Sequence, residues 1–187
     1  NTNDPNYGLP PRRFRIAVAG SSKVGKTTFI LNFLKGYLDP ESAPKLNLDK
    51  LMLDSEGFFE VELEYNNMNY KIEIEEKPIM DNKGNFFLDD DKKYLEDYDG
   101  VIYLFSLVDP ESYIKMQNFY NLQVYNGSKF KPRIAVANKL DLIGEDEYEN
   151  MIDLRKSNIL QDDGNLNFNG TRKWVAEAMN CDYTEVC

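Results

Sequence analysis

A glycine-rich segment near the start of the chain carries residue types suited to holding phosphate groups. Residues 20–27 read Gly-Ser-Ser-Lys-Val-Gly-Lys-Thr, a full match to the pattern Gly-x-x-x-x-Gly-Lys-[Ser/Thr]. Its two glycines allow a tight turn in which successive N–H groups point at one anion. The lysine can reach the β- and γ-phosphates of a nucleotide, and the final hydroxyl can ligate Mg²⁺. The predicted nucleotide contacts are Gly20, Ser22, Lys23, Val24, Gly25, Lys26, Thr27 and Thr28, with Thr27 also on the metal.

A second polar motif, later in the chain, favours guanine over adenine. Residues 138–141 read Asn-Lys-Leu-Asp, directly after an apolar segment. The carboxylate of Asp141 can accept hydrogen bonds from both N1–H and N2–H of guanine, whereas adenine has no such pair of donors. The stem of Lys139 can lie over the ring plane, and Asn138 can tie this motif to the phosphate loop. We therefore predict GTP or GDP as the ligand.

Strand-like and helix-like segments alternate around these two motifs. Apolar runs predict buried strands, and alternating apolar and charged residues predict a hairpin. The predicted strands are residues 14–19, 58–65, 70–75, 101–105, 133–137 and 181–186. Helices are predicted after the phosphate loop up to a stop at Gly36, from Pro110 onward, and from a cap at Thr171. This order predicts an α/β domain, with a six-stranded, mostly parallel sheet, one antiparallel strand and helices on both faces.

The rest of the chain is predicted to be loops around one domain. Residues 1–13 are expected to form a flexible leader, and residues 14–187 the domain itself. The aperiodic segment 37–55 is long enough to suggest a functional loop. Residues 143–169 are acidic and then rich in Asn, Asp and Gly, which predicts a surface insertion with at most a short helix at 148–154.

Composition excludes several classes of function. The net charge of −10 over 187 residues argues against a nucleic-acid partner, because phosphate backbones select basic surfaces. Histidine is absent, which excludes a histidine-based catalytic triad and a histidine-ligated zinc site. No apolar run approaches the roughly 20 residues that span a bilayer. Reduced thiols are the expected state of Cys181 and Cys187, so we expect a cytoplasmic protein that reaches membranes through a partner.

The chain resembles the small GTPases of the Ras superfamily, and the Rab branch most closely. Residues 93–105 look like the second-switch helix and the next strand of Rab proteins, residues 109–113 like their next helix start, and residues 171–187 like their penultimate helix and last strand. The resemblance implies a P-loop G domain that binds GTP, GDP and Mg²⁺. It also implies two switch loops that contact protein effectors or regulators.

Several positions depart from the family pattern. No threonine occurs between Thr28 and Thr171, so the first-switch threonine that binds Mg²⁺ and signals the γ-phosphate is missing. Residues 81–84 read Asp-Asn-Lys-Gly, and their distance from Gly100 favours Asp81 as the metal carboxylate of the Asp-x-x-Gly motif. Counting forward from the hairpin instead gives Glu76 or Pro78.

Three further departures concern catalysis and the phosphate loop. Asn85 stands at the usual glutamine position, and it is one methylene too short to hold the attacking water well. No arginine lies between Arg15 and Arg133, so neither switch supplies an arginine finger. Lys23 replaces a small residue of the phosphate loop, where it either adds charge at the phosphates or points to solvent.

The end of the chain also departs from the family. Val186 and Cys187 fall where family members carry the Ser-Ala-Lys that closes the base pocket, so we assign them to the base site. The final helix of the fold is expected to be absent. A single terminal cysteine is not a prenylation box, and no lipid anchor is evident.

Three functions are compatible with these residues. The first is a slow GTPase switch, and the second is a pseudo-GTPase scaffold or trafficking adaptor that binds protein partners. The third is a P-loop kinase of a small molecule, against which the scarcity of arginine and the guanine motif both count. The missing threonine and glutamine predict slow or absent hydrolysis in the first two.

Overall fold

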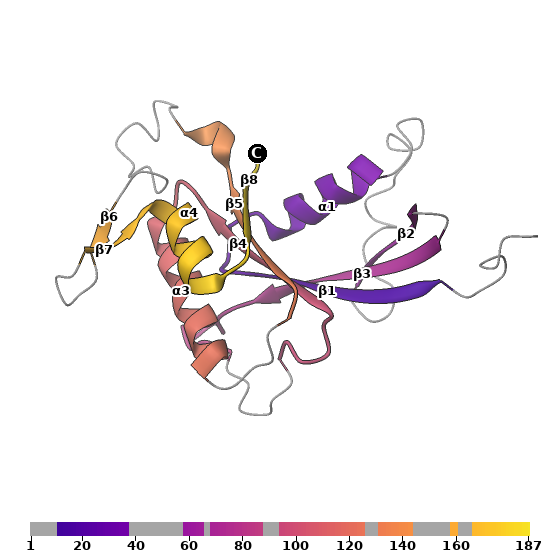
Figure 1. Cartoon of the computed structure of the whole chain (residues 1–187), viewed down its shortest axis with the longest axis horizontal. Helices are drawn as coiled ribbons and strands as arrows, with labels where there is room; N and C mark the ends of the chain where they lie inside the picture. The colour runs from indigo at the N-terminus through magenta and orange to yellow at the C-terminus, as the bar shows by residue number, and fades with distance from the viewer. Residues whose placement is uncertain are drawn as a thin grey trace, which may run out of the picture.

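A six-stranded sheet organises the chain (Figure 1). The computed structural model describes residues 11–37, 58–65, 68–87, 94–125, 131–143, 158–160 and 166–187. The sheet strands are β1 (Arg12–Gly20), β2 (Phe59–Tyr65), β3 (Met68–Pro78), β4 (Gly100–Ser106), β5 (Arg133–Asn138) and β8 (Asp182–Glu185). The helical elements are α1 (Lys26–Tyr37), α3 (Pro110–Tyr125), the 3₁₀ turn η2 (Leu140–Leu142), α4 (Gly170–Trp174) and the π-helical turn η4 (Val175–Met179).

The strand order is β2-β3-β1-β4-β5-β8. Only the β2–β3 pair is antiparallel, and the other four pairs are parallel. Parallel neighbours need crossover connections, which α1, α3 and the α4–η4 segment supply. The predicted fold class, a mostly parallel α/β sheet with one antiparallel strand, is therefore confirmed.

Alternate side chains of the strands build a core on each face of the sheet. On one face, Ile30 and Leu34 of α1 pack with Val18 of β1 and Ile74 of β3. On the other face, helix α3 and the α4–η4 segment pack on residues of opposite parity, such as Ala17. Figure 1 shows α1 on one side of β4 and β5, with α3 and α4 on the other. The central strands β4 and β5 are covered on both faces, and they are rich in apolar residues, whereas the edge strand β8 is more polar and more exposed.

The strand β1 begins earlier than the sequence predicted. The expected leader reached Arg13, but Arg12 and Arg13 already pair with Tyr70 and Lys71 of β3. The pairing is stabilised because the Arg13 guanidinium forms an ion pair with the buried carboxylate of Glu73. Charged residues therefore extend this strand. Residues 1–10 lie outside the described residues.

The helix boundaries differ in detail from those predicted. Helix α1 continues through Gly36 to Tyr37, since a single glycine costs a helix only about 1 kcal/mol. Helix α4 begins at Gly170, so Thr171 lies inside it rather than capping it. The Thr171 hydroxyl instead lies 3.0 Å from the hydroxyl of Tyr183.

Within residues 143–169, the structure contains a small hairpin that the sequence did not predict. Strands β6 (Asn158–Leu160) and β7 (Leu166–Asn169) pair antiparallel, apart from the main sheet. The short helix expected at 148–154 lies outside the described residues. None of the described helices is long and apolar enough to cross a membrane.

Candidate nucleotide-binding site

The phosphate loop joins the end of β1 to the start of α1. Lys23 and Gly25 have positive φ angles of 63° and 91°, so the backbone turns back on itself at two points. A Cβ atom on Gly20 would lie 2.5 Å from the carbonyl oxygen of Leu104, which leaves room for hydrogen alone. The first helical hydrogen bond, from Phe29 N to Gly25 O at 2.8 Å, starts α1 directly behind the loop. The positive end of this helix therefore points at the loop.

Lys26 lies over the phosphate loop. Its Nζ donates hydrogen bonds to the carbonyl oxygens of Gly20 at 3.1 Å and Ser21 at 2.8 Å. Burial lowers the pKa of Lys26 from its usual value of 10.5, and the negative charge of Glu76 partly offsets this. These contacts hold the ammonium group at the loop, where it can bind a phosphate oxygen.

The base loop is tied directly to the phosphate loop. Nδ2 of the buried Asn138 donates a hydrogen bond of 2.9 Å to the carbonyl oxygen of Val24, 114 positions away in sequence. The Asn138 Oδ1 accepts one of 2.8 Å from the backbone N of Lys139, which has a left-handed φ of 65°. Asp141 is exposed within η2, the turn that follows. The structure thus brings together the two motifs that the sequence proposed as one site.

The end of the chain lies beside the base loop. Val186 N donates to Ala137 O at 2.8 Å, and Leu140 N donates to Val186 O at 3.0 Å. Val186 therefore holds η2 against the sheet through backbone contacts, and Cys187 follows it as an exposed residue.

Asp81 and Asn85 close a small turn. The Asp81 carboxylate accepts hydrogen bonds from the backbone N of Lys83 at 2.8 Å and of Asn85 at 2.9 Å. The Asn85 side-chain amide donates a third, at 3.1 Å, and these bonds lower the pKa of Asp81. A bridge between Met80 and Phe86 closes the base of the turn. Gly84 has a φ of 84°, a backbone conformation that favours glycine at this position of the turn.

Glu76 is the carboxylate that faces Lys26. Strand β3 pairs with β1 so that Glu76 lies beside Val18 and Pro78 beside Gly20. Side chains two apart on a strand share a face, so Glu76 lies on the same face as Ile74, the face that α1 covers. The charge of Glu76 acts on the Lys26 ammonium in that position. The hairpin count in the sequence had offered Glu76 as the alternative to Asp81.

A family model supplies an independent comparison. The model of the Ras family matches residues 15–186, which is nearly the whole chain. The chain belongs to the Ras family. It is therefore a GTP-binding, small-GTPase-like protein with a P-loop. A search among curated proteins found no match.

Ras-family GTPases in general bind Mg²⁺, and the residues present here suit that ion. Magnesium is bound through one or two carboxylates, hydroxyl oxygens and substrate phosphates, and it keeps several waters. Thr27, in the first turn of α1, and either Glu76 or Asp81 would hold it beside the phosphates. Among the described residues no cluster of three or more acidic or thiol groups forms a cage by itself.

Proposed function

We propose that this chain binds GTP and GDP between the phosphate loop and residues 138–141, and that it hydrolyses GTP slowly. The observation that carries the proposal is the hydrogen bond from Asn138 to Val24. It fixes the guanine-selective residues relative to the phosphate-binding backbone, so that one ligand can contact both. Protein partners would read the bound nucleotide through residues 37–55 and 79–91, most of which lie outside the described residues.

The residues supply binding and positioning rather than acid–base chemistry. Backbone N–H groups of the phosphate loop, the α1 N-terminus and Lys26 would bind the phosphate chain, and Asp141 would bind the base edge. When bound, Mg²⁺ would offset the charge of the phosphates, held by Thr27 and a carboxylate. Phosphoryl transfer in this class depends on positioning and charge stabilisation, so each missing positioning group lowers the rate.

Slow hydrolysis follows from two features of the chain. No threonine stands between Thr28 and Thr171 to contact both the metal and the γ-phosphate. If Asp81 is the metal carboxylate, Asn85 stands at the position that orients the attacking water, and its amide is already bonded to Asp81 within the turn. These same features favour the second candidate, a pseudo-GTPase scaffold that keeps its nucleotide and presents a constant surface to partners.

The resemblance of residues 93–105 to Rab proteins motivates a finer proposal. We propose a Rab-like regulatory or trafficking role in the cytoplasm, with membranes reached through a protein partner. The net charge of −10 supports the partner, because an acidic chain is repelled by anionic lipid.

Two measurements on the purified protein test the nucleotide proposal and separate the two candidates. Denaturing the protein and identifying the released nucleotide should give GDP or GTP; adenine nucleotide would overturn the assignment. Single-turnover hydrolysis at saturating Mg²⁺ should then give a slow, measurable release of phosphate for a switch. No release above the uncatalysed rate would identify the scaffold.

A further inference from the structure

One arginine contacts the two chain segments that begin at Phe58 and at Tyr94. The guanidinium carbon of Arg15 lies 4.5 Å from the ring centroid of Phe58 and 5.2 Å from that of Tyr98. Phe58 is the first described residue after residues 38–57, and Tyr98 lies at the end of the turn that follows residues 88–93. Both rings are buried, with 6% and 5% of their surface exposed. Cations over aromatic faces are attracted more strongly when they are desolvated.

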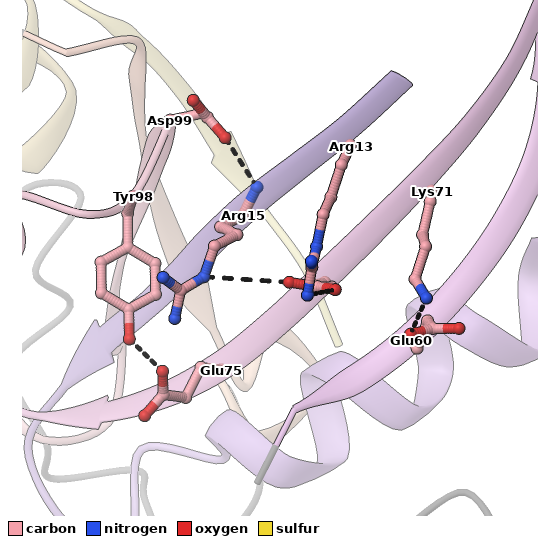
Figure 2. A network of polar contacts seen from close by, with 8 residues as sticks. Arg13, Arg15, Glu60, Lys71, Glu75, Tyr98 and Asp99 are labelled. Atoms are coloured by element: carbon pink, nitrogen blue, oxygen red, sulfur yellow. Dashed lines mark hydrogen bonds and ion pairs between the residues drawn. The ribbon is translucent and has the colours of Figure 1, made fainter. Parts of the chain in front are cut away.

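Arg15 is held in place from the sheet side. Its Nε lies 3.8 Å from a carboxylate oxygen of Glu73, whose side chain is fully buried on the neighbouring strand. Arg13 forms an ion pair with the same carboxylate (Figure 2). A buried carboxylate strongly favours keeping its positive partners, since losing one leaves charge uncompensated. The Arg15 guanidinium therefore has a buried carboxylate near its Nε and two buried aromatic rings within cation–π distance.

The backbone of Arg15 also forms hydrogen bonds with the segment 94–99. Arg15 N donates to the Asp99 carboxylate at 2.8 Å, and Asp99 N donates to Arg15 O at 2.8 Å. These bonds precede the point where β1 and β4 begin to pair, at Ile16 and Gly100. Figure 2 shows the Arg15 side chain beside the Tyr98 ring, with Asp99 above it on the same segment.

The segment 94–99 is further attached at both ends. The Tyr98 hydroxyl donates to the Glu75 carboxylate, and the Tyr94 hydroxyl donates to the carbonyl of Pro78. Pro78 pairs with Gly20, the first residue of the phosphate loop. Lys131 Nζ donates to the carbonyl of Leu95 at 2.7 Å, and to two more carbonyls of the same turn. These contacts connect the segment 94–99 to β3 and, through Pro78, to the strand residue beside the start of the phosphate loop.

We propose that Arg15 is a positioning residue that couples the segment entered at Phe58 to the segment 94–99, so that a partner or ligand moving one of them moves the other. The coupling runs through the planar guanidinium between the rings. It goes beyond the proposed function, because it holds whether or not nucleotide is bound. Removing the ring of Phe58 or of Tyr98 therefore loosens the segment that carries the other ring, provided that the Arg15 guanidinium is present.

Comparing arginine with lysine at position 15 separates the proposed coupling from simple neutralisation of the Glu73 charge. A lysine at position 15 keeps a positive charge for Glu73 but has no planar group to lie between two rings. Arg15→Lys is therefore expected to keep the fold and lose the coupling. A purely structural ion pair would respond to Arg15→Lys without changing how Phe58 and Tyr98 depend on each other.

Hydrogen exchange on the protein as purified, analysed as a double-mutant cycle, tests the proposal. Phe58→Leu should speed exchange at the amides of Tyr98 and Asp99 by about tenfold, the scale of a desolvated cation–π contact. In the Arg15→Lys background the same substitution should change these amides less than about twofold. Equal effects in both backgrounds, or no effect in either, would overturn the proposal.

A control and a reciprocal measurement keep the test decisive. Phe14→Leu removes a ring from the same strand, but one that stacks on Tyr70, so Tyr98 and Asp99 should exchange as before. If Phe58→Leu does not fold, the reciprocal variant Tyr98→Leu is used instead. Hydrogen exchange at the amides of Phe59 and Glu60 should then speed up only when Arg15 is present. Coupling free energies are reciprocal, so loosening in one direction without the other would contradict the proposal.

Discussion

The Nδ2 of Asn138 donates a 2.9 Å hydrogen bond to the carbonyl oxygen of Val24, linking the base loop to the phosphate loop inside the protein. Asn138→Ala leaves that carbonyl buried without its partner. We expect the free energy of unfolding to fall by about 1–3 kcal/mol, the cost of an unsatisfied buried acceptor, and GDP affinity to fall with it. Chemical denaturation and GDP titration measure the two effects. Asn69→Ala, at an exposed site on β3, should change neither.

The same contact makes Gly25 indispensable to the site. A Cβ on Gly25 would lie 2.6 Å from Asn138 Nδ2, and the φ of 91° disfavours any side chain. Gly25→Ala should therefore weaken GDP binding severely. Gly84→Ala is the matched control, because its φ of 84° imposes similar strain with no atom within 4 Å of the new Cβ. Equal losses of GDP affinity in the two variants would assign the effect of Gly25→Ala to backbone strain rather than to the clash.

The two binding motifs and the parallel sheet were predictable because each rests on local chemistry. Residues 20–27 combine flexible glycines with a lysine and a hydroxyl, and residues 138–141 combine an amide, a lysine and a carboxylate. Both segments follow the end of a strand, so each motif can be recognised within a short stretch of sequence. The strand beginning at Arg12 was not predictable in this way. Arg13 and Arg15 make the segment polar, and only the neighbouring strand reveals that both surround Glu73.

Long-range register also bears on the choice between Glu76 and Asp81, which stays open. The spacing from Gly100 pointed to Asp81, which the structure shows engaged by its own turn. The spacing from the hairpin pointed to Glu76, which the β1–β3 pairing brings alongside the strand that ends in the phosphate loop. The β6–β7 hairpin was missed because its strands have only three and four residues, too short for the alternation in Leu166–Asn169 to stand out from the surrounding polar segment.

Asp141→Asn should weaken GTP and GDP binding sharply and improve xanthine nucleotides relative to guanine nucleotides. The carboxylate offers two acceptors to the two donors of guanine, whereas an amide offers one acceptor and one donor. Xanthine replaces the exocyclic amine by a carbonyl, which suits the amide. Competition titrations with GDP and xanthosine diphosphate measure the switch. An unchanged GDP affinity would mean that the base is read elsewhere.

Lys26→Ala and Thr27→Ala should both impair GDP binding, but with different dependence on metal. Lys26 already lies at the loop, bonded to Gly20 and Ser21, and is expected to contact phosphate directly. Its loss should persist when Mg²⁺ is chelated. Thr27 is expected to act through the metal, so its effect should largely disappear under chelation. Equal losses from Thr27→Ala with and without Mg²⁺ would contradict its assignment.

Glu76→Gln and Asp81→Asn distinguish the two candidate carboxylates of the metal site. Glu76 faces the Lys26 ammonium on the α1 side of the sheet, whereas the Asp81 carboxylate accepts three hydrogen bonds from its own turn. We therefore expect Glu76→Gln to reduce the gain in GDP affinity on adding Mg²⁺ by about tenfold or more, because a carboxylate that would help to hold the metal is lost. With Mg²⁺ chelated, the same variant should bind GDP more tightly than the unsubstituted protein, because a negative charge beside the phosphates has been removed.

Asp81→Asn should leave both affinities near those of the unsubstituted protein. The opposite pattern, with the Mg²⁺ effect lost in Asp81→Asn and kept in Glu76→Gln, would return the metal to Asp81 and require its turn to open when nucleotide binds.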